Sequence, residues 1–170
     1  GVIISDYNKG ICTELVIKNI ISKAKESQLP IFVDPKGKNW NKYYGASVIT
    51  PNLKEVEEAF GKVLITDKDV EIAGEEICTD LSLDACLITR GANGMSYIGK
   101  DIKLHVSSEA KEIYDVSGAG DTVIASFAAA LLAGFDFSTV TKFANKAAGI
   151  VVGHIGTTAI TISELIEDGN

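Results

Sequence analysis

Short apolar runs alternate with helical patterns through the first half of this 170-residue chain, and this alternation limits the fold more than any other feature. Four apolar runs have the length and composition of buried strands, and they cover residues 2–5, 31–33, 46–49 and 85–89. Three helical patterns fall between them, at residues 13–29, 52–60 and 70–78. Strands that alternate with helices predict parallel β-α-β units, and therefore an α/β fold with a parallel-rich sheet and helices on both faces.

The second half of the chain extends this pattern. Apolar runs at 95–98 and 102–106 flank Gly99-Lys100-Asp101, which predicts a hairpin. Two Ala-rich helices follow at about 119–133 and 138–152, with Gly134 as a C-cap between them. Since we find no internal repeat, low-complexity tract or linker, we expect residues 1–170 to form a single domain.

Charge and composition argue against several kinds of partner. A net charge of −7 does not supply the basic face that a nucleic acid requires. No stretch approaches the roughly 20 apolar residues that span a bilayer. The cysteines are odd in number and show no CxxC spacing, as expected for free thiols in a reducing compartment, and we expect a cytoplasmic location.

Residues 115–122, Asp-Val-Ser-Gly-Ala-Gly-Asp-Thr, run directly into an apolar helical pattern. Gly118, Ala119 and Gly120 would leave several backbone N–H groups unobstructed at a helix N-terminus, where the helix dipole also favours an anion. Asp121 could then take a proton from a hydroxyl that attacks a phosphoryl group held there. The alternative is an ordinary Gly-rich helix start with Asp121 in a capping role.

Several polar residues fall just past the ends of the expected strands. They are Asp6, Asp34, Asn52, Thr89 and Arg90. Ligands of parallel α/β sheets bind at the carboxyl ends of the strands, so this convergence favours a binding site over a generic domain. The P-loop pattern GxxxxGK[ST] and a strand-linked GxGxxG are both missing, which argues against a P-loop or protein-kinase type of nucleotide site.

Asn52 and Glu55 have the spacing of a capping box, in which each residue bonds to the backbone of the other. The same oxygen atoms also suit a hydrated Mg²⁺, which prefers oxygen ligands and keeps several waters. Both interpretations can hold together, because a capping carboxylate can still face a metal-bound water.

The segment Thr89-Arg90-Gly91-Ala92-Asn93-Gly94 follows a strand and contains two glycines. Arg90 could neutralise nucleotide phosphates, and Gly91 and Gly94 would let the backbone approach a ligand closely. The alternative is a simple β-turn. Lys9 and Lys36 lie in strand-end loops as well, but they are weaker candidates because a single loop lysine is most often a solvated charge.

Together these segments resemble the PfkB/ribokinase family of sugar kinases. Residues 115–121 and the Ala-rich helix after them are similar to its C-terminal signature, and three further segments occur in the family's order: 50–55, 89–94 and 145–148. Within the family, residues 5–10 and 33–37 are most similar to the heptose-7-phosphate 1-kinase branch, which serves ADP-heptose synthesis for lipopolysaccharide. Ser126 departs from the broad signature, which prefers Gly or Ala at that position. The resemblance implies a Rossmann-like, ribokinase-type fold.

The resemblance also implies ATP and Mg²⁺ as cofactors and a role for each matched residue. It makes Asp121 the catalytic base, with an anion hole formed by Gly118, Ala119 and Gly120. It places the Mg²⁺ and the nucleotide phosphates beside Asn52 and Glu55. The phosphates and ribose would lie beside Thr89, Arg90, Gly91 and Gly94, and the adenine beside Asn145 and Ala148. Weaker contacts to the sugar phosphate would come from Asp6, Lys9 and Lys36.

In such a kinase the first residues of this chain would align with the middle of the protein. The resemblance therefore implies the C-terminal part, with the ATP-binding and catalytic residues but without the lid and most of the sugar contacts. It further implies a homodimer in the intact kinase and a fused or separate nucleotidyltransferase domain. Two alternatives remain open: another PfkB kinase, acting on fructose phosphate, ribose or a nucleoside, and a nucleotide-binding module without catalysis.

Overall fold

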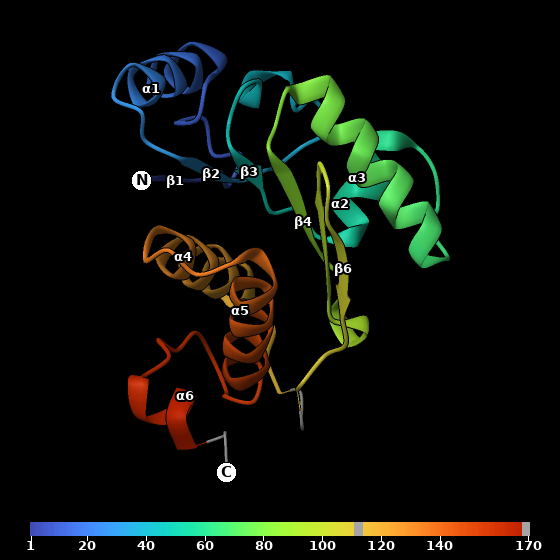
Figure 1. Cartoon of the computed structure of the whole chain (residues 1–170), viewed down its shortest axis with the longest axis vertical. Helices are drawn as coiled ribbons and strands as arrows, with labels where there is room; N and C mark the ends of the chain where they lie inside the picture. Colours follow the sequence, from blue (N-terminus) through green and yellow to red (C-terminus); the bar gives the residue numbers. More distant parts are fainter. Residues whose placement is uncertain (111–113, 168–170) are drawn as a thin grey trace.

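The computed structural model describes residues 1–110 and 114–167 and shows a sheet with helices on both faces (Figure 1). The strands are β1 (Val2–Ser5), β2 (Ile31–Asp34), β3 (Val48–Ile49), β4 (Ala85–Thr89), β5 (Met95–Gly99) and β6 (Lys103–Val106). The helices are α1 (Glu14–Glu26), α2 (Leu53–Phe60), α3 (Asp67–Leu81), α4 (Ala119–Leu132), α5 (Phe137–Val151) and α6 (Ile162–Glu167). Two 3₁₀ turns cover Asn41–Tyr43 and Gly91–Asn93.

The strands lie in the sheet in the order in which they occur along the chain, from β1 to β6. The pairs β1–β2, β2–β3 and β3–β4 are parallel, whereas β4–β5 and β5–β6 are antiparallel. The expected α/β fold with a parallel-rich sheet and a hairpin is therefore confirmed. Parallel neighbours place their carboxyl ends at the same edge of the sheet, and this edge carries the polar residues singled out above.

Two hydrophobic cores fill the two faces of the sheet, because side chains alternate between faces along a strand. In β2, Ile31 and Val33 join the core under α1, α2 and α3, whereas Phe32 joins the core under α4 and α5. Phe127 of α4 is fully buried in the second core and lies edge-on to Phe32, with 6.3 Å between the ring centroids. This packing fixes α4 against the sheet.

The helix starts follow the expected capping chemistry. Thr13 accepts a hydrogen bond from the backbone N–H of Val16 and caps α1. Asn52 and Glu55 form the expected capping box of α2. Gly134 follows α4 with φ of 91°, a conformation that favours glycine after a helix C-terminus.

Some boundaries differ from expectation. The α3 helix begins at Asp67, earlier than expected, because a second capping box forms between Thr66 and Asp69. The β3 strand is limited to two residues, and α6 was not expected from the sequence. All three cysteines are free, as expected, with Cys86 buried and Cys12 and Cys78 half-buried.

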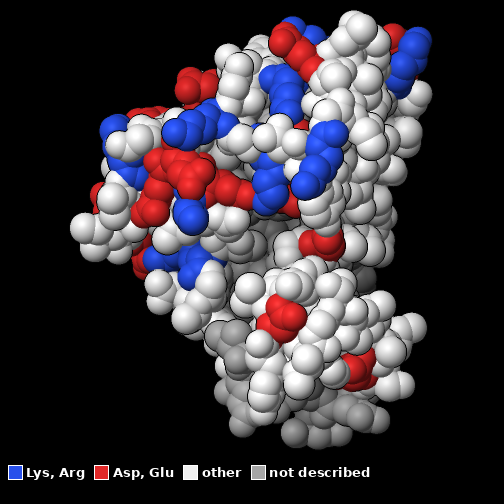
Figure 2. All heavy atoms as spheres, turned by 180° about the vertical axis from the view of Figure 1, so that it is seen from behind, with Lys and Arg blue, Asp and Glu red and all other residues white. Residues whose placement is uncertain are grey.

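Charged side chains are unevenly distributed over the face opposite to that of Figure 1. Figure 2 shows acidic and basic groups gathered over its upper part, with few charges over the lower part. Among the described ion pairs, those of Lys103 with Glu71 and Glu75 join β6 to α3. In the described part of the chain, no helix has the length and apolar character needed to cross a membrane.

Candidate active site

A cavity of about 510 Å³ lies at the carboxyl ends of the parallel strands and is bordered by α4 and α5 on one side of the sheet. Most of the residues expected at the site line it. They are Lys36, Asn52, Glu55, Thr89, Gly91, Gly94, Ala119, Gly120, Asn145 and Ala148. The fold thus brings together segments from β2, β3, β4, α4 and α5, which are widely separated in the sequence.

Five expected residues lie outside the cavity lining: Asp6, Lys9, Arg90, Gly118 and Asp121. Lys9 is exposed in the loop that follows β1. Gly118 directly precedes the lining residues Ala119 and Gly120, and Asp121 directly follows them. Gly118 and Asp121 therefore lie at the edge of the site.

A backbone bridge joins two of the segments that line the cavity. Asn52, beyond the end of β3, and Thr89, the last residue of β4, pair as an isolated parallel bridge, and the Thr89 N–H donates to the Pro51 carbonyl at 3.0 Å. The capping box holds Asn52 from its other side: Glu55 N–H donates to Asn52 Oδ1 at 2.9 Å, and Asn52 N–H donates to Glu55 Oε2 at 2.8 Å. The start of α2 and the loop after β4 consequently form one wall of the cavity.

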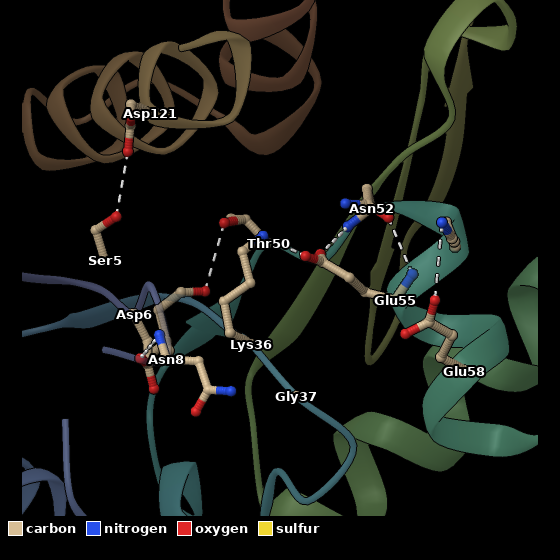
Figure 3. A network of polar contacts seen from close by, with 12 residues as sticks. Ser5, Asp6, Asn8, Lys36, Gly37, Thr50, Asn52, Glu55, Glu58 and Asp121 are labelled. Carbon is tan, nitrogen blue, oxygen red and sulfur yellow. Dashed lines mark hydrogen bonds and ion pairs between the residues drawn. The ribbon is translucent and has the colours of Figure 1, made fainter. Parts of the chain in front are cut away.

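Lys36 reaches this wall from β2. Its ammonium forms an ion pair with Glu55 Oε1, so that both carboxylate oxygens of Glu55 have protein partners (Figure 3). Burial lowers the pKa of Lys36, but the hydrogen bond and charge of Glu55 outweigh it and leave that pKa above its ordinary value. The loop behind Lys36 is anchored by Trp40, whose indole N–H donates to the Gly37 carbonyl at 2.8 Å.

The side-chain oxygen atoms of this wall are compatible with a magnesium ion that is held through water. Asn52 and Glu55 supply oxygen atoms, which Mg²⁺ prefers, and Mg²⁺ usually keeps several waters and uses only one or two carboxylates together with substrate phosphates. Within residues 1–110 and 114–167, no cluster of three or more His, Cys, Asp or Glu side chains forms a potential metal site. Lys36 already neutralises Glu55, so direct coordination by that carboxylate would require exchange of its partner.

The loop after β4 is tightly fitted around Gly94. This residue has φ of 80° and ψ of −128°, and an added Cβ would lie 1.9 Å from the Val106 carbonyl oxygen. Gly91 has φ of 57°, but a Cβ there would meet no atom within 4 Å. The backbone of β6 therefore sets the position of this loop through Gly94.

Arg90 points away from the cavity. Its Nη1 atom lies 2.7 Å from Asp67 Oδ1 at the start of α3 and donates to Ser96 Oγ at 3.1 Å. The side chain is 10% exposed, and its Nε is a buried atom without a hydrogen-bond partner. Arg90 thus joins β4 to α3 and β5 in this structure, whereas its neighbours Thr89 and Gly91 face the cavity.

The start of α4 presents its first turn to the cavity. Gly118 has φ of 82° as the N-cap and forms no side-chain capping bond, while the Ala119 N–H donates to the Val116 carbonyl at 3.2 Å. No atom lies within 4 Å of an ideal Cβ on Gly120, so the space above this residue is open. On the other side, Asn145 of α5 is buried and donates to the Ser107 carbonyl at 2.8 Å, which fixes the strand-to-helix connection beside the cavity.

Asp121 accepts hydrogen bonds from two residues that sequence reasoning did not identify as functional. Ser5 Oγ donates to Asp121 Oδ1 at 3.1 Å, and Tyr7 Oη donates to Asp121 Oδ2 at 2.6 Å (Figure 3 shows the Ser5 contact). The sequence signals for them were their position beside Asp6 at the end of a strand and their place in the segment 5–10 that carries part of the family resemblance.

Asp6 is 1% exposed and fully engaged within the protein. Its carboxylate accepts hydrogen bonds from Tyr43 Oη at 2.7 Å, Lys42 Nζ at 2.5 Å and the Asn8 N–H at 2.7 Å. Burial raises the pKa of Asp6, but these donors outweigh that effect and leave the pKa below its ordinary value. Asp6 therefore anchors the loop after β1.

Asp34, at the end of β2, lines the cavity near these charged groups. Burial raises its pKa to about 6, the ammonium of Lys36 opposes the rise, and the carboxylates of Glu55, Asp121 and Asp6 add to it. A carboxyl group with a raised pKa in the folded state stabilises the protein below its unfolded pKa, and this contribution is lost as the pH rises through about 6.

We therefore expect Asp34→Asn to increase stability at pH 7.5 by up to roughly 3 kcal/mol, and to have little effect near pH 4. Thermal unfolding of both proteins between pH 4 and 8 measures this difference. Asp101→Asn, in the exposed turn of the hairpin, is the matched control for the same substitution at the surface. An increase in stability for Asp34→Asn that is equal at all pH values would contradict the raised pKa of Asp34.

Comparisons with known proteins identify the family and the fold of this chain. The model of the pfkB family carbohydrate kinases matches residues 3–164. Two of the most similar relatives are both named bifunctional protein HldE. The one from Mesorhizobium japonicum is 44% identical over 164 residues, covering 96% of this chain and 33% of the relative. The one from Rhodospirillum rubrum is 43% identical over 167 residues, covering 98% and 34%. This chain thus spans about a third of the length of these curated relatives.

Solved structures show the same fold. Phosphofructokinase-2 from Escherichia coli, in complex with substrates and products, has a TM-score of 0.85 at 18% identity and covers 98% of this chain and 54% of its own. Ribokinase from Arabidopsis thaliana, complexed with ribose and ATP, has a TM-score of 0.77 at 23% identity and covers 85% and 48%. The fold is therefore ribokinase-like, as the resemblance implied. Since the family model matches nearly the whole sequence, and the matched segments meet around one cavity, this chain belongs to the pfkB family of carbohydrate kinases.

Proposed function

We propose that this chain is the ATP-binding and catalytic part of a sugar-phosphate kinase, with heptose 7-phosphate as the acceptor and Asp121 as the general base. The observation that carries this proposal is the position of Asp121 at the start of α4. It directly follows Ala119 and Gly120, which line the cavity opposite Asn52, Glu55 and the loop after β4. The proposed base and the proposed anion-binding helix start thus share one edge of a cavity whose volume of about 510 Å³ is in the range of small-molecule sites.

In the proposed reaction, the anomeric hydroxyl of the sugar attacks the γ-phosphorus of ATP. A new O–P bond forms, the bond between the γ-phosphorus and its bridging oxygen breaks, ADP leaves, and Asp121 takes the hydroxyl proton. The N–H groups at the start of α4 stabilise the charge that develops on the transferred group. Mg²⁺, when bound, neutralises phosphate charge, and Asn52 and Glu55 are the residues that would hold it, through water.

The choice of acceptor rests on the similarity of residues 5–10 and 33–37 to the heptose-7-phosphate 1-kinase branch. The fold itself does not select the sugar, since the similar structures include a phosphofructokinase and a ribokinase. The HldE relatives are named bifunctional and are about three times as long. We accordingly include in the proposal a cytoplasmic homodimer, further sequence that supplies most of the sugar contacts, and a nucleotidyltransferase domain.

Calorimetric titration of the folded chain with Mg-ADP should show one binding site. Turnover is then measured with the natural polypeptide that carries this chain, using heptose 7-phosphate, fructose 6-phosphate and ribose as acceptors. We expect the largest kcat/KM for heptose 7-phosphate. A preference for another sugar would overturn the acceptor assignment alone, whereas ADP binding without turnover of any acceptor would favour a non-catalytic nucleotide-binding module.

A further inference from the structure

We propose that Tyr7, assisted by Ser5, is a positioning residue that holds the Asp121 carboxylate in the orientation needed for proton transfer. This inference rests on the proposed role of Asp121 as the base. Tyr7 Oη lies 2.6 Å from Asp121 Oδ2, and Ser5 Oγ lies 3.1 Å from Asp121 Oδ1. Each carboxylate oxygen therefore has its own hydroxyl donor.

These contacts cross from one layer of the fold to another. Asp121 belongs to the first turn of α4, whereas Ser5 ends β1 and Tyr7 lies in the loop that follows. Asp121 is exposed, so packing alone does not restrict rotation of its side chain. Two hydroxyl donors at different oxygens fix the plane of the carboxylate, and alignment of a catalytic group with its substrate supplies a large part of enzymatic rate enhancement.

The two hydrogen bonds leave the carboxylate able to accept a proton. An ionised carboxylate has about four lone-pair sites on its two oxygens, and Ser5 and Tyr7 occupy one on each. The remaining sites can receive the hydroxyl of the acceptor sugar. The phenol and the sugar hydroxyl can therefore bind the same carboxylate together.

The loop that presents Tyr7 is rigidly anchored at its neighbouring residue. Asp6 lies between the two donors, and its buried carboxylate is held by Lys42 and Tyr43. The Tyr7 side chain, in contrast, is 58% exposed. Loss of its hydroxyl group consequently opens no core cavity, and Tyr7→Phe should fold normally.

The surroundings of Tyr7 provide a direct spectroscopic readout. The hydrogen bond to Asp121 raises the pKa of Tyr7 above its ordinary value, with smaller contributions from burial and from the charges of Asp121 and Asp34, while the neighbouring Ser5 side chain opposes the rise. The charge of Lys36 also interacts with Tyr7. Removal of the Asp121 charge should therefore lower the pKa of Tyr7.

The first experiment titrates the chain labelled with ¹³Cζ-tyrosine, with the Tyr7 resonance assigned from Tyr7→Phe. The pKa of Tyr7 should fall towards its ordinary value in Asp121→Asn. Tyr44, which is 59% exposed, is the internal control, and its resonance should respond equally in both proteins. An identical Tyr7 titration in both proteins would show that the contact is absent in solution and would overturn the proposal without reference to kinase activity.

The second experiment measures turnover in the natural polypeptide. Tyr7→Phe should lower kcat about tenfold to a hundredfold, as expected for loss of a hydrogen bond to a charged group, and leave the KM for ATP unchanged. Ser5→Ala should have a smaller effect in the same direction, and Tyr44→Phe should have none. In an Asp121→Asn background, Tyr7→Phe should cause no further loss, because Tyr7 acts through that carboxylate.

Two outcomes of the second experiment would overturn the positioning role. One is full activity of Tyr7→Phe while Asp121→Asn is inactive. The other is a lower KM for the sugar at unchanged kcat, which would show that the phenol competes with the acceptor for the carboxylate. Full activity of Asp121→Asn would instead remove the base from the proposed function, and the two failures are thus distinguishable.

Discussion

Asp121→Asn should reduce turnover of the natural polypeptide by about 10²-fold or more, while the affinity for Mg-ADP stays within about twofold of the original. The amide has the same shape as the carboxylate and leaves the start of α4 unchanged, but it accepts a proton far less readily. Steady-state kinetics and calorimetric ADP binding, measured on the same preparations, separate chemistry from nucleotide affinity.

Asp136→Asn is a suitable control for this substitution. Asp136 caps α5 through bonds from the backbone of Ser138 and Thr139, and asparagine is an equally good N-cap. The control should therefore keep both stability and turnover. Near-normal activity of Asp121→Asn, with the control behaving as expected, would remove Asp121 from the role of base.

The second large effect concerns the loop after β4. Gly94→Ala should destabilise the protein by roughly 3 kcal/mol or more, because its backbone conformation is strained for alanine and the new Cβ would clash with the Val106 carbonyl. For a chain of this size the loss corresponds to a decrease in Tm of about 6–12 °C. Thermal unfolding followed by circular dichroism measures it.

Gly91→Ala is the matched control within the same loop. It also places alanine at a positive φ, but in open space, so it should cost only about 1 kcal/mol. The difference between the two variants contains the clash with β6 and the greater backbone strain at Gly94. Equal losses in both variants would show that the close approach of Gly94 to Val106 does not constrain the loop.

Local patterns were sufficient to predict most of the fold. The capping signals at Thr13 and Asn52 place the starts of α1 and α2, and the alternation of strands and helices places the polar strand ends at one edge. These features depend on neighbours in the sequence and on general rules of parallel sheets. The same reasoning missed α6 and the capping box that starts α3 early.

Contacts between distant segments could not be predicted in this way. Nothing in the sequence indicates that Tyr7 and Ser5 reach Asp121, because that contact depends on how α4 packs on the sheet. Arg90 was expected to face phosphates, yet its guanidinium lies against Asp67, the first residue of α3, which begins three residues earlier than the pattern indicated. Its role in nucleotide binding stays a prediction, as do the other roles that the family resemblance implies.

The backbone bridge between Asn52 and Thr89 has a mechanical consequence. It joins the first residue before α2 to the last residue of β4, so the helix that carries Glu55 and the glycine loop are connected through the backbone as well as through the cavity that both line. A force applied to the loop is transmitted to Glu55 through peptide groups, without rearrangement of any side chain. A ligand that displaces the loop after β4 will therefore also displace the start of α2.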